Sequence, residues 1–141
     1  MTSLTTRKEI IEKLTKFRMV DKYAAFYEAL PDVRFAHASQ RAIVSDLLNN
    51  CAKELIYLFT TAKKKPRKTD LKNVLKCHMD LISHAALDEV NKEFAYKLCW
   101  FLAEKAEVNL PKQTAAKYWG YWQVVNDEVK IVKYRKPRKR L

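Results

Sequence analysis

Apolar and polar positions recur with the period of an α-helix along most of the chain, most clearly over residues 88–108. Projected at about 100° per residue, one side of this stretch is apolar and carries Val90, Phe94, Leu98, Phe101, Leu102 and Ala106. The opposite side holds two aromatic residues, Tyr96 and Trp100, among the charged residues Glu89, Glu93, Lys97, Glu104 and Glu107. A helix with an apolar face and an aromatic face is typically covered from two directions. We therefore predict that residues 88–108 form the central helix of a small helical domain.

Capping patterns predict where the other helices begin. Thr6-Arg7-Lys8-Glu9 has the spacing of a capping box, and Ile10, Leu14 and Phe17 follow at helical spacing. Asp21 is expected to begin a second helical segment, which ends before Pro31 because the residue before a proline avoids the helical conformation. Asp88 is expected to cap the central helix, and Pro111 to terminate it.

Two more helices are predicted between these segments. The first opens at or beside Ser39 and reaches about residue 62, and its apolar stripe comprises Ile43, Leu47, Cys51, Leu55, Leu58 and Phe59. The second is expected to be capped by Thr69-Asp70, and its stripe comprises Leu71, Val74, Leu75, His78, Leu81 and Ile82. Between them lies the cationic loop KKKPRK, which Pro66 interrupts.

The last thirty residues leave two interpretations open. YWQVV and VKIVKY are rich in β-branched and aromatic residues and are separated by Asn126-Asp127-Glu128, which is typical of a β-hairpin. A helical continuation is the competing interpretation, and a short helix from Pro111 to Tyr118 fits either one. An isolated hairpin is marginally stable in water, so we expect Trp119, Tyr121 and Trp122 to pack on the Tyr96/Trp100 face. Residues 135–141 are predicted to form a mobile basic tail.

Composition favours a mainly α fold, a compact helical bundle of four to five helices that forms one domain over residues 1–134. The chain has 141 residues and a single glycine, whereas strand-rich folds need glycine in their turns and bulges. One glycine is also too few for a phosphate-binding loop or a dinucleotide fingerprint, so we expect neither nucleotide-binding site and no cofactor. No secretory signal and no stretch long enough to span a membrane is recognisable, which predicts a cytoplasmic protein.

Positive charge is concentrated in two short runs. The net charge is +12, and removing eleven cations in these runs from the 28 basic residues leaves 17 against 16 acidic ones. Such clusters can neutralise phosphates or steer an acidic protein surface into contact. The predicted binding residues are therefore Lys63, Lys64, Lys65, Arg67 and Lys68 in the loop, and Lys133, Arg135, Lys136, Arg138, Lys139 and Arg140 near the C-terminus.

Candidate catalytic or metal-binding residues are few. Cys77, Asp80 and His84 share one helix face and could begin a metal site or a Cys–His nucleophile, although no fourth ligand is evident. We favour a hydrogen-bonded core role for His78, and reduced, buried thiols for Cys51, Cys77 and Cys99. The carboxylate pairs Glu89/Glu93 and Glu104/Glu107 are expected to form surface ion pairs with Lys92 and Lys97 rather than to act as acid and base. The aromatic cluster Tyr118, Trp119, Tyr121 and Trp122 suits core closure, or contact with bases or a partner.

The run Leu71-Lys72-Asn73-Val74-Leu75-Lys76, followed by Glu93-Phe94-Ala95-Tyr96 through Leu102-Ala103-Glu104, resembles a small bacterial family of unknown function. Its members are single-domain proteins of about this length in which an LKxxLK helix precedes an EFxYxLxxxLAE helix and a tryptophan-containing segment. The resemblance covers roughly residues 40–125 and implies the fold, but no reaction and therefore no catalytic residue. The KKKPRK loop and the basic tail depart from the family pattern.

Three functional hypotheses remain. The preferred one is a non-enzymatic, cytoplasmic protein-binding module of the immunity or antitoxin type that engages an acidic partner. The alternative is a nucleic-acid-binding accessory protein that uses the basic loop and tail. The third is an enzyme that uses Cys77 and His84.

Overall fold

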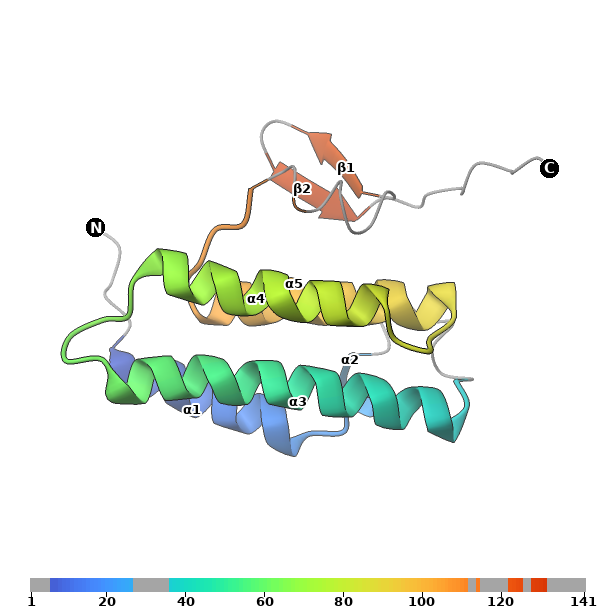
Figure 1. Ribbon diagram of the computed structural model, residues 1–141, viewed down its shortest axis with the longest axis horizontal. Coiled ribbons are helices and arrows are strands. Elements are labelled where there is room, and N and C mark those ends of the chain that lie inside the picture. Colours follow the sequence, from blue (N-terminus) through green and yellow to red (C-terminus); the bar gives the residue numbers. More distant parts are fainter. Residues whose placement is uncertain (1–5, 27–35, 112–113, 115–121, 126–127, 132–141) are drawn as a thin grey trace. The chain divides into compact units, whose positions relative to one another are not determined.

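The first unit of the chain is a bundle of helices. The computed structural model describes residues 6–26, 36–111, 114, 122–125 and 128–131, and the chain divides into two units, Met1–Asn109 and Leu110–Leu141. The described helices are α1 (Arg7–Met19), α2 (Lys22–Phe26), α3 (Ala38–Thr61), α4 (Lys68–Ser83) and α5 (Glu89–Lys105), all in the first unit (Figure 1). The mainly α bundle predicted from periodicity and glycine scarcity is thus confirmed. The predicted single domain reaching residue 134 stays a prediction.

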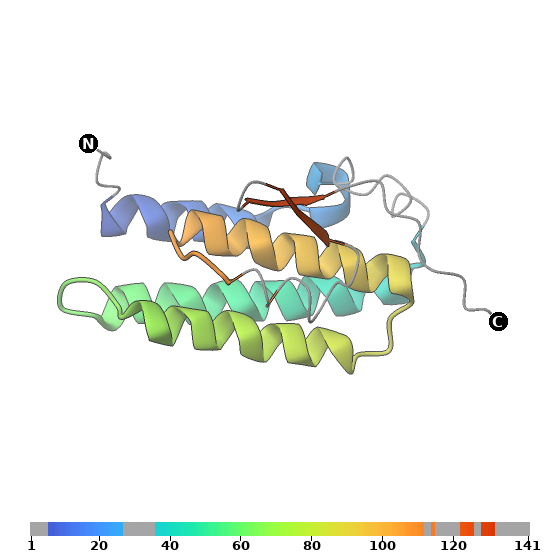
Figure 2. The same cartoon turned by 90° about the horizontal axis from the view of Figure 1, so that it is seen from above.

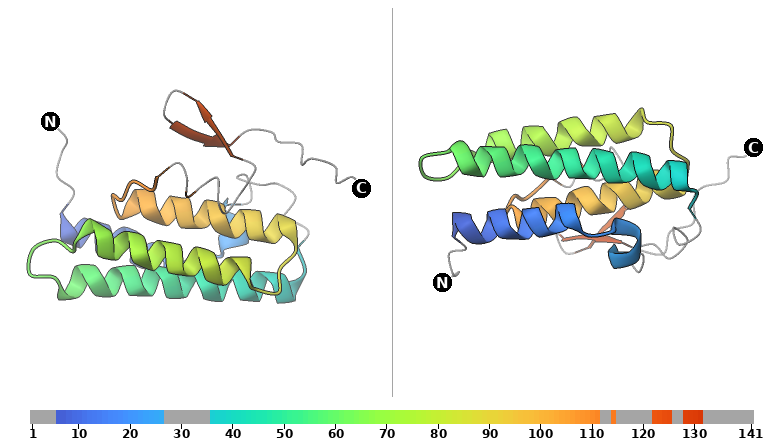
Figure 3. Two further views of the ribbon diagram at one scale, coloured as in Figure 1. Left: turned by 45° about the horizontal axis from the view of Figure 1, so that its top comes forward. Right: turned by 90° about the horizontal axis from the view of Figure 1, so that it is seen from below.

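The four long helices lie side by side, with α1 and α3 on one level and α4 and α5 on the other (Figures 1 and 2). Both α3 and α5 contact each of the other three long helices, and α1 packs chiefly on α3. The central position predicted for residues 88–108 is therefore shared with α3. The view from below in Figure 3 shows how α3 runs the length of the bundle between its neighbours.

The core confirms most of the predicted apolar stripes. Phe94 and Leu98 of α5 are fully buried, whereas Phe101 is half-buried. Burial of a large apolar side chain contributes roughly 1.5–3 kcal/mol, so these inward positions dominate the stability of the bundle. Two expectations were wrong in detail: Leu81 is 47% exposed, and Lys97, assigned to the charged face, is buried.

The N-terminal helices are capped as predicted. The Thr6 hydroxyl accepts from the backbone N–H of Glu9, and the Glu9 carboxylate accepts from Thr6, which completes the capping box. Asp21 Oδ1 accepts from the backbone N–H groups of Tyr23 and Ala24 at the start of α2. Because these contacts satisfy amides that a first turn leaves free, they define where each helix begins.

The start of α4 differs from the prediction. The residue preceding the helix is Arg67, whose side chain makes no capping hydrogen bond, and Thr69 and Asp70 lie within the first turn. Asp70 instead forms an ion pair with Arg67 at 3.2 Å. An acidic residue inside the first turn is also favourable, because it faces the positive end of the helix dipole.

Helix α5 begins in a polar network that runs from exposed Asp88 to buried Asn91 and Tyr23. Asp88 Oδ1 accepts from the backbone N–H of Asn91 at 2.8 Å, which confirms the predicted cap, and also from the Asn91 side chain at 2.8 Å. Asn91 Oδ1 in turn accepts from the Tyr23 hydroxyl at 2.7 Å. The network therefore ties α2 to the first turn of α5.

The other end of α5 closes without glycine. Val108 N donates to the Ala103 carbonyl at 2.8 Å and Glu107 N to the Glu104 carbonyl at 3.1 Å, the two bonds of a Schellman motif. Glu107 stands at the position that glycine usually takes, with φ of 62°. A side chain with a Cβ is strained in this left-handed conformation.

The second unit contains a two-stranded antiparallel hairpin, β1 (Trp122–Val125) and β2 (Glu128–Ile131). Trp122 pairs with Ile131 and Val125 with Glu128, so the strands are joined through residues 126–127. This agrees with the hairpin interpretation over the paired residues. The expected short helix from Pro111 and the aromatic contacts of Trp119 and Tyr121 lie largely outside the described residues.

Candidate functional site

The basic loop joins α3 to α4 at one end of the bundle (Figure 1). Its first attachment comes from α1, because Nη1 of Arg7 donates to the carbonyl of Phe59 at 3.5 Å and to that of Ala62. These carbonyls belong to the last turn of α3, where a helix lacks internal donors and carries partial negative charge. Arg7 thus fixes the point at which the loop leaves α3.

The structure separates the five predicted loop cations into two groups. Arg67 pairs with Asp70, and Lys68 Nζ donates to the Glu107 carbonyl at the end of α5. Lys63, Lys64 and Lys65 are exposed and have no hydrogen-bond or ion-pair partner within the described part of the chain. Within the described residues, Arg67 and Lys68 therefore contact other groups, whereas three consecutive lysines are exposed without such contacts.

The second predicted cluster lies outside the described residues. It comprises Lys133, Arg135, Lys136, Arg138, Lys139 and Arg140, so their participation in binding stays a prediction.

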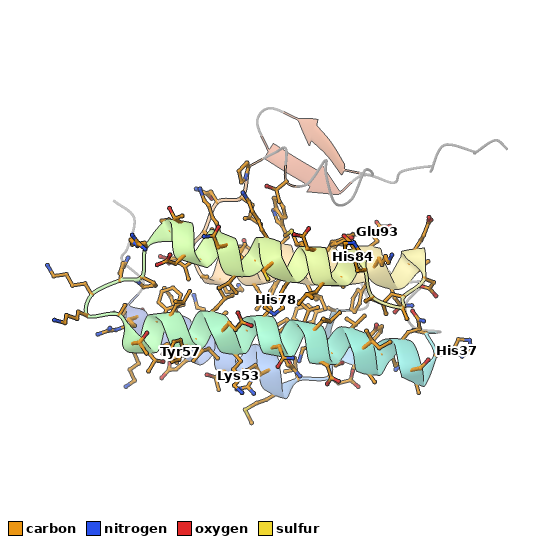
Figure 4. All side chains as sticks on the ribbon, viewed as in Figure 1. His37, Lys53, Tyr57, His78, His84 and Glu93 are labelled. Carbon is orange, nitrogen blue, oxygen red and sulfur yellow. The ribbon has the colours of Figure 1, made fainter. Side chains whose placement is uncertain are left out.

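A hollow of about 490 Å³ lies between α3 and α4, the two helices that the loop connects. Tyr57 and Leu81 line it and are 65% and 47% exposed, and Lys53 lies beside them. In Figure 4, Lys53 and Tyr57 lie on α3, and His78 lies between α3 and α4. Sequence analysis missed this surface, because it assigned Leu81 to the core and did not single out Tyr57.

His78 forms the buried side of this hollow. Its Nδ1 lies 3.0 Å from the Val74 carbonyl and its Nε2 lies 3.5 Å from Oε2 of Glu54. A carbonyl only accepts, so Nδ1 is the donor in the first contact. The predicted hydrogen-bonded core role of His78 is confirmed, and the contact with Glu54 links α4 to α3.

The structure does not assemble Cys77, Asp80 and His84 into a reaction site. Cys77 is exposed, which corrects its predicted burial, and His84 Nδ1 bonds to the backbone carbonyl of Asp80 at 2.9 Å. Among the residues described, no three His, Cys, Asp or Glu side chains are placed to hold a metal ion. Hydrogen bonding to Cys99 and burial raise the pKa of the Cys51 thiol well above its ordinary value, which disfavours the reactive thiolate.

The carboxylate pairs have separate environments. Glu93 pairs with Lys97 at 3.6 Å, but Lys97 is buried, so this contact is not the surface ion pair that was expected. Burial lowers the pKa of Lys97, and the charge of Glu93 opposes this shift. The second expected cation, Lys92, donates to the Ser83 carbonyl at 2.8 Å. Neither contact brings two carboxylates together for acid–base work.

Comparisons with known proteins do not identify the chain: no protein-family model, curated protein or solved structure matches it. The resemblance to a small bacterial family therefore stays a prediction. None of the described helices combines the length and apolar character required to cross a membrane.

Proposed function

We propose that this protein is a non-enzymatic binding module that engages an acidic protein through Lys63, Lys64 and Lys65. The observation that supports this most directly is the separation of the loop cations into anchored and available groups. Arg67 and Lys68 already contact Asp70 and a backbone carbonyl, whereas Lys63, Lys64 and Lys65 are exposed and make no such contact among the described residues. Because Arg7, Arg67 and Lys68 hold the loop, less ordering accompanies binding.

The adjoining surface favours a protein over a nucleic acid as the partner. Tyr57 and Leu81 are exposed between the two helices that carry the loop, beside Lys53. Exposed aromatic and aliphatic side chains next to cations suit a protein interface, which combines an apolar centre with a charged rim. Immunity and antitoxin proteins are modules of this kind, and they are encoded beside the toxins that they neutralise.

The proposal is tested with two charge-matched variants. K63Q/K64Q/K65Q removes the available loop cations, and K8Q/R18Q/K76Q removes the same charge from exposed positions on α1 and α4. The product of the neighbouring gene is co-expressed, purified and measured against each variant by surface plasmon resonance at several salt concentrations. Loss of electrostatic steering by the loop should slow association by about tenfold or more in the loop variant only.

Two results would overturn the proposal. One is an equal effect of both variants, which would reflect net charge rather than the loop. The other is the absence of any protein complex together with retention on DNA or RNA that weakens steeply with salt. That second outcome would establish the alternative, a nucleic-acid-binding accessory protein, because phosphate contacts release counterions.

A further inference from the structure

A second hollow, of about 240 Å³, opens on the side of the bundle formed by α1, α2 and α5. Three phenylalanine rings line it, with centroids 5.8 Å apart for Phe17 and Phe26, 5.9 Å for Phe17 and Phe101, and 4.8 Å for Phe26 and Phe101. The rings of Phe26 and Phe101 are only half-buried. Together they form an apolar, aromatic wall that the described helices leave open.

The other polar side chains of the described lining are lysines. Lys13 and Lys16 of α1 and Lys105 of α5 contribute them, and none of the described lining residues is acidic. The Lys105 ammonium lies 4.9 Å from the centroid of the Phe101 ring, so one positive charge is held directly at the aromatic wall. The hollow therefore combines an apolar interior with positive charge around it.

The neighbouring Lys22 supports Phe17, which forms the inner side of the hollow. Lys22 Nζ donates to the carbonyls of Phe17 and Val20 at 2.8 and 3.1 Å, and it lies 4.6 Å from the centroid of the Phe17 ring. These contacts hold the end of α1 and orient the Phe17 ring. The inner wall is thus formed before any ligand arrives, which lowers the ordering that binding requires.

We propose that this hollow binds a small anionic amphiphile, a medium-chain carboxylate whose apolar tail lies against the three rings and whose carboxylate lies among the lysines. Pockets for small molecules usually enclose roughly 300–1,000 Å³, and this hollow of about 240 Å³ lies just below that range, so it suits only a short ligand. Its chemistry selects against neutral and cationic amphiphiles of the same length. The site is independent of the basic loop and of the function proposed above.

The test is isothermal titration calorimetry of the full chain with octanoate and octylammonium below their micelle concentrations and with octan-1-ol below its solubility limit. Octanoate should bind at least tenfold more tightly than octan-1-ol, and octylammonium should not bind. K16E and K105E should each weaken octanoate binding several-fold. The matched control K8E introduces the same charge change on α1 outside the hollow and should leave the affinity within about twofold, as expected for an exposed charge screened by salt.

Further variants locate the ligand. F26A removes a half-buried ring from the wall and should weaken octanoate at least fivefold, with helix content by circular dichroism confirming the fold. K63Q/K64Q/K65Q should leave octanoate binding unchanged, so the experiments test this proposal and the proposed function independently. Equal affinity for octanoate and octan-1-ol, equal effects of K16E and K8E, unaltered binding in F26A, or no binding of octanoate would each overturn it.

Discussion

Replacing Glu107 by glycine should stabilise the protein, although the substitution removes a side chain. Glu107 has a φ of 62° in the Schellman motif that ends α5. The left-handed conformation costs a residue with a Cβ about 1–2 kcal/mol. Glycine removes this strain, but it also increases the conformational entropy of the unfolded chain, which lowers the free energy of unfolding by about 0.4–1 kcal/mol. The backbone effect alone should therefore raise the free energy of unfolding by about 0–1.6 kcal/mol, with a midpoint of about 0.8 kcal/mol.

The charge of Glu107 makes a second contribution to stability, and a control variant must separate it from the backbone effect. Glu107 places a carboxylate at the negative end of α5, so its removal should gain about 0.3–1 kcal/mol at low ionic strength. E107A gains this contribution but retains the Cβ and its strain. The hydrogen bond from Lys68 uses the backbone carbonyl of Glu107, so neither substitution removes it.

The measurement is equilibrium unfolding in urea, monitored by circular dichroism, for wild type, E107A and E107G. E107G should unfold at the highest urea concentration, with an unchanged m-value, which indicates that the same surface is exposed on unfolding. The difference between E107G and E107A gives the net backbone effect, which is the strain relieved at residue 107 minus the entropic cost of glycine in the unfolded chain. If E107G is no more stable than E107A, the strain at this residue does not exceed the entropic cost of glycine and the reasoning is wrong.

Three further substitutions test the polar contacts of Lys22, Tyr23 and Glu9. K22M keeps an apolar stem over Phe17 but leaves the carbonyls at the end of α1 without their charged donor. The free energy of unfolding measured in urea should therefore fall by about 1–3 kcal/mol. Unchanged stability would mean that the cost of burying the charge cancels the gain from its contacts. Y23F leaves buried Asn91 without its donor and should cost about 1–2 kcal/mol. Burial raises the Tyr23 pKa, so wild type should lose stability more steeply than Y23F above the ordinary tyrosine pKa of about 10, and parallel pH profiles would contradict this. Hydrogen bonds from Thr6 lower the Glu9 pKa. The contribution of the capping box to stability should therefore be present above the ordinary glutamate pKa and be lost as the pH falls through the lowered value. In thermal unfolding at a series of pH values, E9Q should lose less stability on acidification than wild type.

Periodicity predicted the helices because each must bury one apolar face, and this requirement is visible without knowing the partner. The caps at Thr6, Asp21 and Asp88 were equally predictable from the sequence, since a short polar side chain there accepts hydrogen bonds from the free backbone N–H groups of the first helical turn. The start of α4 could not be predicted in the same way, because an aspartate such as Asp70 is favourable both before a helix and inside its first turn. A local pattern cannot choose between two positions that stabilise the same element.

The candidate site could be predicted only in part from the sequence, for a related reason. The sequence locates the loop cations, but which of them are available depends on partners distant in the chain, such as the Glu107 carbonyl that binds Lys68. Lys22 illustrates the same limit more sharply. A lysine is expected at the surface, yet Lys22 is 1% exposed because the turn at Val20 brings unbonded carbonyls within reach of its Nζ.

The hollow beside α1 follows from what periodicity leaves undecided. The pattern places Phe17 and Phe101 on apolar faces, and the two rings do meet at 5.9 Å. It does not say whether neighbouring helices extend far enough to cover them. Helix α1 ends at Met19, and Phe26 of α2 contacts both rings and is half-buried. How far the described helices cover an apolar face that is flanked by lysines is therefore recognisable only once the contacts between the helices are known.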